Sequence, residues 1–262
     1  MRFIVFGGGG DMGSRAVAEL AITPGVERIT IVGRSRAPLE RSRAQALEAQ
    51  QTAAQAAAAQ QAASQQASSY APAADIVIET VDASDHDKVV ALMREHDVSL
   101  GALGPFYVFE EPMVKAAIAA RKPYVSLCDD ADAAAAALKH DDAARQAGVT
   151  IVTGLGWTPG LTNILALRAA ARLDKTTSVT IAWAGSAQES GGHAVALHTL
   201  HIFDGKVTTF ADGRHMDVPA GTEPEYVEFP PPLGKVRVCH VGHPEPLTLP
   251  AQIRGVRSVA LK

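Results

Sequence analysis

The stretch Phe3-Ile4-Val5-Phe6-Gly7-Gly8-Gly9-Gly10-Asp11-Met12-Gly13 decides the fold of this chain. Its apolar start predicts a buried strand, and its glycines predict a sharp turn into a helix. Gly8, Gly10 and Gly13 have the G-x-G-x-x-G spacing of dinucleotide-binding turns. We expect Gly8 to permit the turn, Gly10 to leave room for a pyrophosphate, and Gly13 to let the helix approach the strand. The helix start, with Asp11 and Met12, would offer backbone N–H groups to the phosphates.

The composition is that of a soluble globular protein. The chain has 262 residues, 47% of them hydrophobic, and a net charge of -4, which gives no reason to expect nucleic acid or an anionic membrane as a partner. No apolar run reaches the roughly 18 residues of a membrane span, and the start of the chain does not have the pattern of a signal peptide. Cys128 and Cys239 are far apart in the sequence. We therefore expect a cytoplasmic protein.

Short apolar segments alternate with helical segments up to residue 152. The pattern predicts further strands at residues 29–32, 76–78, 98–103, 124–127 and 149–152. Such alternation indicates an α/β fold, a doubly wound parallel sheet of the Rossmann type that binds ligands beyond the carboxyl ends of its strands. We assign residues 1–156 to this NAD(P)-binding domain. The alanine- and glutamine-rich residues 44–70 interrupt it, as a long helix or a partly disordered surface insertion with nothing to dock it firmly; a glutamine-rich interaction tract is the alternative.

The end of the second predicted strand bears on cofactor choice. NAD-selective sites usually place an acidic side chain here to accept the ribose hydroxyls, whereas this chain has Arg34, Ser35 and Arg36. Guanidinium groups can pair with a 2′-phosphate, and Ser35 could add a hydrogen bond. We therefore expect NADP in preference to NAD. The alternative is that both arginines merely cover a solvated helix start.

The pattern changes after Trp157-Thr158-Pro159-Gly160. A helix is predicted over residues 161–172, followed by strands at residues 179–183, 198–203, 207–210, 226–229 and 236–241. Asp204-Gly205 lies between two of these strands and predicts a hairpin. Residues 157–262 are therefore expected to form a second, strand-rich α+β domain.

Several stretches together resemble the saccharopine dehydrogenase family, which includes saccharopine reductases and lysine 6-dehydrogenase-like proteins. They are the glycine turn, Gly104-Pro105-Phe106, Tyr124-Val125-Ser126-Leu127-Cys128-Asp129-Asp130, Gly156-Trp157-Thr158-Pro159-Gly160-Leu161-Thr162-Asn163, Phe229-Pro230-Pro231-Pro232-Leu233-Gly234 and Gly242-His243-Pro244-Glu245-Pro246. The resemblance implies a Rossmann domain and a mixed domain for substrate binding and homodimer formation. It also implies NAD(P)-linked oxidation of a CH–NH or CH–NH2 bond in a small amino-acid-derived substrate. Chains of that family usually continue well past this point, so we expect the second domain to be incomplete at its C-terminal end.

Candidate site residues follow from this resemblance and from the strand ends. Gly104, Pro105 and Phe106 are expected near the nicotinamide ribose. The segment Trp157-Thr158-Pro159-Gly160 starts a helix whose N-terminus could hold a substrate carboxylate, helped by a hydroxyl of Thr158 or Thr162. The alternative is a well-capped helix between two domains.

Candidates for proton transfer are Asp130, His198 and His243. Asp129 and Asp130 end a strand, where burial could raise a carboxyl pKa, although helix capping is the competing role and Asp132 could cap equally well. Each histidine could be a general acid or a hydrogen-bonded structural residue. Candidate carboxylate clamps are Arg214, Arg237 and Arg254, and Cys128 is expected to be a small buried residue.

No metal site is expected. His198 and His201 are three residues apart on a predicted strand and would point to opposite faces, and His240 and His243 have no carboxylate or cysteine at ligand spacing. The alternative to an enzyme is an NADP-binding sensor or scaffold without turnover, which an assay of cofactor absorbance with amines would distinguish. A carbonyl reductase is disfavoured because no Tyr-x-x-x-Lys pair follows the middle strands.

Overall fold

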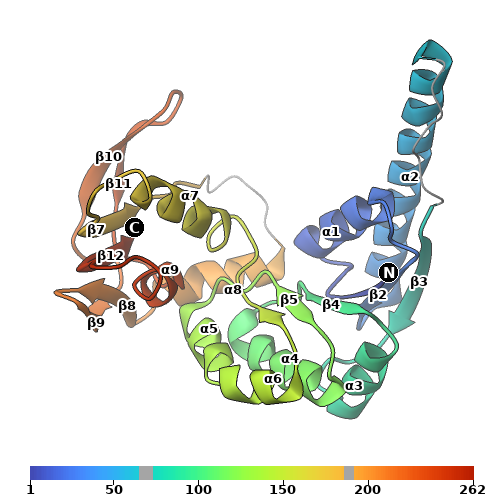
Figure 1. The fold of residues 1–262 in the computed structure, drawn as a ribbon, viewed down its shortest axis with the longest axis horizontal. Helices are drawn as coiled ribbons and strands as arrows, with labels where there is room; N and C mark the ends of the chain where they lie inside the picture. Colours follow the sequence, from blue (N-terminus) through green and yellow to red (C-terminus); the bar gives the residue numbers. More distant parts are fainter. Residues whose placement is uncertain (65–72, 186–191) are drawn as a thin grey trace. The chain divides into compact units, whose positions relative to one another are not determined.

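The computed structural model describes residues 1–64, 73–185 and 192–262, and these form two compact units (Figure 1). Unit 1 comprises Met1–Gly104, Val108–Ser126 and His140–Val152. Unit 2 comprises Pro105–Tyr107, Leu127–Lys139 and Thr153–Lys262. Three segments that the sequence assigns to the first domain therefore cluster with the second unit, namely residues 105–107, 127–139 and 153–156.

Unit 1 is built on a six-stranded parallel sheet in the order β3-β2-β1-β4-β5-β6. This is the doubly wound α/β fold that the alternating pattern predicts. Its strands are β1 (Arg2–Phe6), β2 (Arg28–Gly33), β3 (Asp75–Thr80), β4 (Val98–Gly101), β5 (Tyr124–Ser126) and β6 (Ile151–Val152). Its helices are α1 (Asp11–Ile22), α2 (Arg36–Ser64), α3 (His86–Arg94), α4 (Phe106–Ala120) and α6 (Asp141–Ala147).

The core of unit 1 lies around β1 and β2. Val5, Ile29 and Ile31 are fully buried and pack with Val17 of α1 and Leu39 of α2. Both faces of these central strands are covered, which explains why their sequences are continuous apolar runs rather than alternating ones.

The alanine- and glutamine-rich stretch is helical through residue 64, and its first half docks on the domain. Ala46 is fully buried, so its small side chain lets α2 lie close to its neighbours. The Nε2 atom of Gln50 donates hydrogen bonds to the carbonyls of Ala21 and Ala74, at 3.2 and 2.9 Å. The expectation that nothing would dock this helix is therefore wrong, while residues 65–70 of the stretch lie outside the described residues.

Unit 2 contains a mixed four-stranded sheet in the order β7-β12-β8-β9 and a separate antiparallel ribbon, β10-β11. The strands are β7 (Ser178–Ile181), β8 (Lys206–Ala211), β9 (Arg214–Pro219), β10 (Glu225–Phe229), β11 (Gly234–Val238) and β12 (Ser258–Leu261). The helices are α5 (Ala131–Leu138), α7 (Leu161–Ala170), α8 (His193–Ile202) and α9 (Glu245–Thr248). Phe210, Leu249, Ile253 and Val259 form its main core, so the last strand is a structural centre of the unit.

Two predictions in this unit are wrong. Residues 198–203 belong largely to helix α8, because a short apolar run of mixed periodicity suits either a strand or a buried helix. The hairpin turn is Asp212-Gly213, which joins β8 to β9 with φ of 52° and 78°, as a two-residue hairpin requires. Asp204-Gly205 instead connects α8 to β8. Among the described residues, none of the helices is long and apolar enough to span a membrane.

Candidate functional site

The glycine turn joins β1 to α1 in unit 1. Gly7 has a φ of 77°, and a side chain there would collide with the carbonyl oxygen of Ala102. The N–H groups of Gly7 and Gly8 both donate to the carbonyl of Val32, at 2.9 and 3.3 Å. The conformation that only glycine adopts easily is therefore at Gly7. Gly8 also has no room for a side chain, because a Cβ there would lie 2.5 Å from Cγ2 of Ile31, which agrees with the turn role predicted for it. A side chain at Gly13 would collide with the carbonyl of Gly7, so the close approach predicted for Gly13 is confirmed.

Gly10 leaves space at the start of α1. It is the N-cap residue, has a φ of -83°, and an added Cβ would meet only the Gly7 carbonyl oxygen, at 3.3 Å. Gly10, Asp11 and Met12 are exposed, and none of the described side chains caps the helix at Gly10. The first N–H groups of a 12-residue helix are thus available to an anion. This geometry fits the pyrophosphate of a dinucleotide.

The end of β2 presents Arg34, Ser35 and Arg36 to solvent. Arg36 begins α2 and forms an ion pair with Glu40 at 2.7 Å. Arg34 makes no ion pair within 4 Å in the described part of the chain, although its charge helps to lower the pKa of Asp82, behind the larger effect of hydrogen bonds from Ser84. Arg34 is therefore the better placed of the two arginines to pair with a phosphate.

The segment after β4 divides between the two units. Gly104 belongs to unit 1, whereas Pro105 and Phe106 belong to unit 2, and Phe106 is the first residue of α4. Within unit 2, Phe106 packs against Cys128 and Ala133, so Cys128 is the small buried residue that the sequence predicts. The contact of Gly104, Pro105 and Phe106 with a nicotinamide ribose stays a prediction.

A group of charged side chains, here called the acidic–histidine cluster, lies within unit 2. It consists of Asp129, Asp130, His198, His243 and Glu245. The Nδ1 atom of His198 is 2.6 Å from Oδ1 of Asp130 and 3.4 Å from Oδ1 of Asp129. The ring of His243 meets that of His198 edge-on with 5.3 Å between centroids, and its Nδ1 is 3.6 Å from Oε2 of Glu245. The structure thus brings all three predicted proton-transfer residues together.

His198 and His201 lie on helix α8 and not on a strand, so they do not point to opposite faces as the sequence predicted. Residues three apart on a helix share a face, so His198 reaches Asp130 while His201 reaches Asp132, at 3.2 Å. Asp129, Asp130 and His198 also place one ligand atom each within 4.8 Å of one another, so the reason given against a metal ion at His198 is wrong. The 2.6 Å contact is nevertheless a hydrogen bond between His198 and Asp130, which a metal ion would have to replace.

The environment separates the proton affinities of the cluster. Burial disfavours the charge of Asp130, but hydrogen bonds from His198 and from the Tyr107 N–H, at 2.9 Å, outweigh it and lower its pKa. Burial also acts against the charge of His198, yet Asp130 and Asp129 outweigh it and raise the His198 pKa. Burial raises the pKa of Asp129 despite its neighbour His198. The arrangement is therefore a charged Asp130–His198 pair beside a carboxylate that readily accepts a proton.

The raised pKa of Asp129 gives a stability prediction. A group whose folded pKa lies above its unfolded value of 3.8 contributes stability below that value and loses it as the pH rises through the folded pKa. Asp129→Asn removes the charge, so we expect it to raise stability at pH 7 by about 1 kcal/mol, or roughly 2–4 °C in Tm. Thermal unfolding from pH 4 to 8 measures this, and a gain that grows toward low pH would contradict it.

Asp130 occupies the N-cap position of α5 but does not cap the helix with its side chain. Its two oxygens instead accept hydrogen bonds from the Tyr107 N–H and from His198. Asp132 accepts a hydrogen bond from the N–H of Ala133 at 2.9 Å. The predicted carboxylate clamps Arg214, Arg237 and Arg254 are all exposed.

The Trp157–Gly160 segment is tied to the same cluster through Glu245. The hydroxyls of Thr158 and Thr162 both donate to Oε1 of the fully buried Glu245, at 2.6 and 2.8 Å. These hydroxyls, which the sequence assigns to a substrate carboxylate, are therefore already bound to a protein carboxylate. Pro159 packs against Gly154, Gly160 has a φ of 118°, and Trp157 is 71% exposed. Sequence reasoning missed the role of Glu245, whose only signal was the Gly242-His243-Pro244-Glu245 stretch of the family resemblance.

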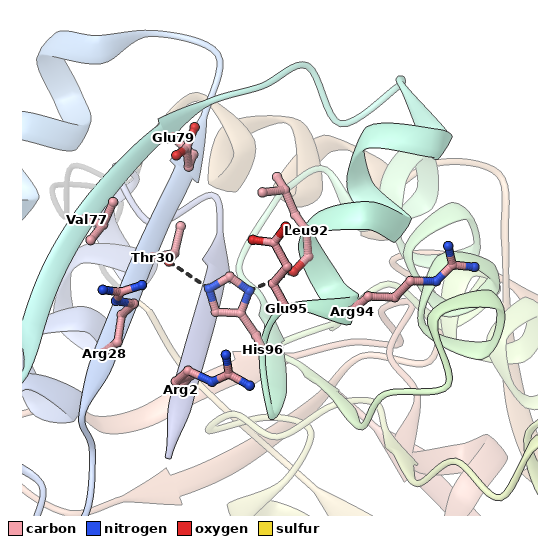
Figure 2. A pocket seen from close by; sticks show the side chains of 9 residues that line it. All are labelled: Arg2, Arg28, Thr30, Val77, Glu79, Leu92, Arg94, Glu95 and His96. Carbon is pink, nitrogen blue, oxygen red and sulfur yellow. Dashed lines mark hydrogen bonds between the residues drawn. The ribbon is translucent and has the colours of Figure 1, made fainter.

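A separate hollow of about 390 Å³ lies on the sheet of unit 1 (Figure 2). It lies at Arg2 and Arg28, the first residues of β1 and β2, and thus at the strand ends opposite the glycine turn. His96 is one of the residues that line the hollow in Figure 2. Both of its ring nitrogens are hydrogen-bonded, one to Thr30 Oγ1 and the other to the Leu92 carbonyl, each at 2.7 Å. The two arginines contact Asp97 and Asp75. This hollow is not the dinucleotide site.

Comparisons with known proteins identify the family of the chain and agree with its fold. Residues 3–152 match the family model of the saccharopine dehydrogenase NADP binding domain. The fold resembles that of apo saccharopine dehydrogenase (L-Glu forming) from Saccharomyces cerevisiae, with a TM-score of 0.62 and 14% identity over 99% of this chain and 54% of that one. A β-ketoacyl-[ACP] reductase from Bacteroides thetaiotaomicron is more distant, with a TM-score of 0.39 and 13% identity over 58% of this chain and 73% of that one. The chain spans about half the length of the yeast protein, and it belongs to the saccharopine dehydrogenase family by its NADP-binding domain.

Proposed function

We propose that this protein is an NADP-dependent oxidoreductase that transfers a hydride between NADP(H) and the CH–NH or CH–NH2 bond of an amino-acid-derived substrate. The observation that carries the proposal is the match of residues 3–152 to an NADP-binding domain whose glycine turn has room for a pyrophosphate. The acidic–histidine cluster supports it, because amine oxidation also requires a group that moves a proton.

The residues of unit 1 would hold the cofactor. The N-terminus of α1 after Gly10 would bind the pyrophosphate, and Arg34 with Ser35 would bind the 2′-phosphate. Bound NADP⁺ supplies the hydride acceptor, so the remaining task of the protein is to hold the substrate and to manage one proton.

Asp129 would manage that proton. Substrate amines are mostly protonated near neutral pH, and an ammonium nitrogen has no lone pair to assist the loss of a hydride. In the proposed step the N–H bond breaks, an O–H bond forms at Oδ1 of Asp129, and the neutral amine remains. His198, held by Asp130 at 2.6 Å, would keep its proton and orient Asp129 from 3.4 Å. The raised pKa of Asp129 suits it to accept the proton.

Exchange of Arg34 tests the cofactor choice. We expect Arg34→Asp to weaken NADPH binding by about 10- to 100-fold, the range of a lost charge-assisted hydrogen bond, and to improve binding of NADH, because the carboxylate can accept the ribose hydroxyls. Calorimetric titration with each cofactor measures both effects. Arg36→Asp is the matched comparison and should have the smaller effect, because Arg36 is already paired with Glu40. Unchanged NADPH affinity in Arg34→Asp would exclude Arg34 from the site.

The activity itself is tested by following cofactor absorbance while amines are offered with NADP⁺. Turnover of any CH–NH or CH–NH2 compound supports the proposal. Tight NADPH binding without turnover of any amine tested would instead favour a sensor or scaffold.

A further inference from the structure

We propose that the acidic–histidine cluster binds an organic ammonium group, so that this part of unit 2 recognises the cationic amine of a ligand and not a carboxylate. Taking that ligand to be the substrate rests on the proposed function; the binding preference itself does not. The proposal reverses the role that the sequence assigns to the start of α7, which was expected to hold a substrate carboxylate.

Buried polar atoms without hydrogen-bond partners are concentrated in and beside the acidic–histidine cluster. In the described residues, eight buried side-chain nitrogen and oxygen atoms have no hydrogen-bond partner, and five of them belong to Asp129, Trp183, His243 and Glu245. The ring of Trp183 lies 6.0 Å from that of His243. A buried polar atom without a partner is costly in a folded protein, so the concentration of such atoms in one place indicates a site that a ligand completes.

His243 is the strongest member of this set. It is 1% exposed, and neither ring nitrogen makes a hydrogen bond. Its Nδ1 faces Oε2 of Glu245 at 3.6 Å, a distance too long for a hydrogen bond. Its ring lies edge-on against that of His198, with 5.3 Å between centroids, and Nδ1 of His198 is 3.4 Å from Oδ1 of Asp129. An unpartnered ring buried against the carboxylates distinguishes this group from a cluster of acidic residues at a surface.

The chemistry of the unpartnered atoms selects the ligand. Of the five unpartnered atoms, Oδ1 of Asp129 and Oε2 of Glu245 accept hydrogen bonds when ionised, a neutral His243 ring has one accepting and one donating nitrogen, and Nε1 of Trp183 only donates. A ligand that satisfies the three accepting atoms must bring several N–H donors on one centre. An ammonium group has three.

The charge balance agrees with this choice. Three carboxylates lie beside two histidines: Asp129 and Asp130 face His198, and Glu245 faces His243, so the carboxylates outnumber the histidines even if both rings are charged. The group therefore carries an excess of negative charge. The hydroxyls of Thr158 and Thr162 could otherwise donate hydrogen bonds to a ligand carboxylate, but both donate to Glu245. A ligand carboxylate would therefore be repelled by these three side chains and would find neither threonine hydroxyl available as a donor.

A metal ion is less suited to the same residues. To coordinate one through Nδ1, His198 would have to give up its 2.6 Å bond to Asp130 and the proton of that bond. An ammonium group needs no such change, because the atoms it would contact are the unpartnered ones.

The test uses two probes of equal chain length and opposite charge. We expect 1,5-diaminopentane to bind the full chain at least 10-fold more tightly than pentanedioate in calorimetric titrations, both without cofactor and with saturating NADP⁺. Asp129→Asn should weaken diaminopentane binding at least 10-fold. Asp132→Asn, a matched change on the exposed side of α5, should leave it unaltered, and circular dichroism verifies that both variants are folded.

Three results would overturn the proposal: equal or tighter binding of pentanedioate, undiminished diaminopentane binding in Asp129→Asn, or Zn²⁺ or Mn²⁺ alone binding to the cluster and excluding the diamine. The outcome is separable from the proposed function. NADPH binding and amine turnover with no preference for the cationic probe would support the proposed oxidoreductase and refute ammonium binding by the cluster. Diamine binding without NADPH binding would support ammonium binding and refute the proposed oxidoreductase.

Discussion

Gly13→Ala is expected to destabilise unit 1 by roughly 3 kcal/mol or more and to abolish NADPH binding. A single methyl group at this position would collide with the backbone carbonyl of Gly7, which is held in place by the turn between β1 and α1. Backbone cannot move aside as the end of a flexible side chain can, so the helix must shift away from the sheet. The shift would separate the phosphate-binding N–H groups from the turn.

Gly10→Ala is the matched variant. Its methyl group would meet only the Gly7 carbonyl at 3.3 Å, and the φ of -83° suits any residue. We expect it to keep the fold, with a change in stability below about 1 kcal/mol, but to weaken NADPH binding at least 10-fold because the methyl group occupies the space left for the pyrophosphate. Urea unfolding and calorimetric titration of both variants separate the two glycine roles. If Gly13→Ala is as stable as the wild-type protein, Gly13 is not needed for the close packing of α1 on the turn. If Gly10→Ala keeps the wild-type affinity for NADPH, Gly10 does not provide space for the pyrophosphate.

The contrast between these glycines shows what the sequence could predict. The strand, turn and helix of residues 3–22 follow an apolar run and a glycine spacing that lie within that stretch, so the local pattern was enough to predict these elements. The requirement for glycine at Gly7 was not predicted, because it depends on the close passage of Ala102, which follows strand β4. Local patterns do not contain such a contact.

Helix α8 shows the same limit. The run around His198 has no clear period, and what makes it helical is that Ile202 is buried with Val241 and Leu261, distant in the sequence. Once residues 198–202 are helical, His198 reaches Asp130. The acidic–histidine cluster draws on distant parts of the sequence, so Asp130, His198 and His243 could be named singly as candidates, whereas the role of Glu245 and the contacts within the cluster could not be foreseen. The hydroxyls of Thr158 and Thr162 were given the wrong partner for the same reason.

Glu245→Ala is expected to destabilise unit 2 by about 3–5 kcal/mol, the usual cost of removing one member of a buried charged network. Glu245 is fully buried and accepts both threonine hydroxyls, so its loss leaves those hydroxyls without an acceptor and removes the carboxylate 3.6 Å from the His243 ring. Glu245→Gln keeps an oxygen for the hydroxyls and should cost about 1–2 kcal/mol. Glu228→Gln, at an exposed position of β10, should change stability by less than about 0.5 kcal/mol.

The pH dependence of this loss identifies the charge as its cause. Burial pushes the pKa of Glu245 upward, but His243, Thr158 and Thr162 outweigh it, so the folded pKa is lower than the unfolded value of 4.5. A carboxylate of this kind contributes stability that is present above the unfolded pKa and is lost as the pH falls through the folded one. The difference in Tm between the unchanged protein and Glu245→Gln should therefore be constant from pH 8 to about pH 5 and shrink at lower pH. A difference that persists unchanged at pH 3.5 would mean that Glu245 stabilises unit 2 by its shape and hydrogen bonds and not by its charge, and it would weaken the case that the cluster holds a cation.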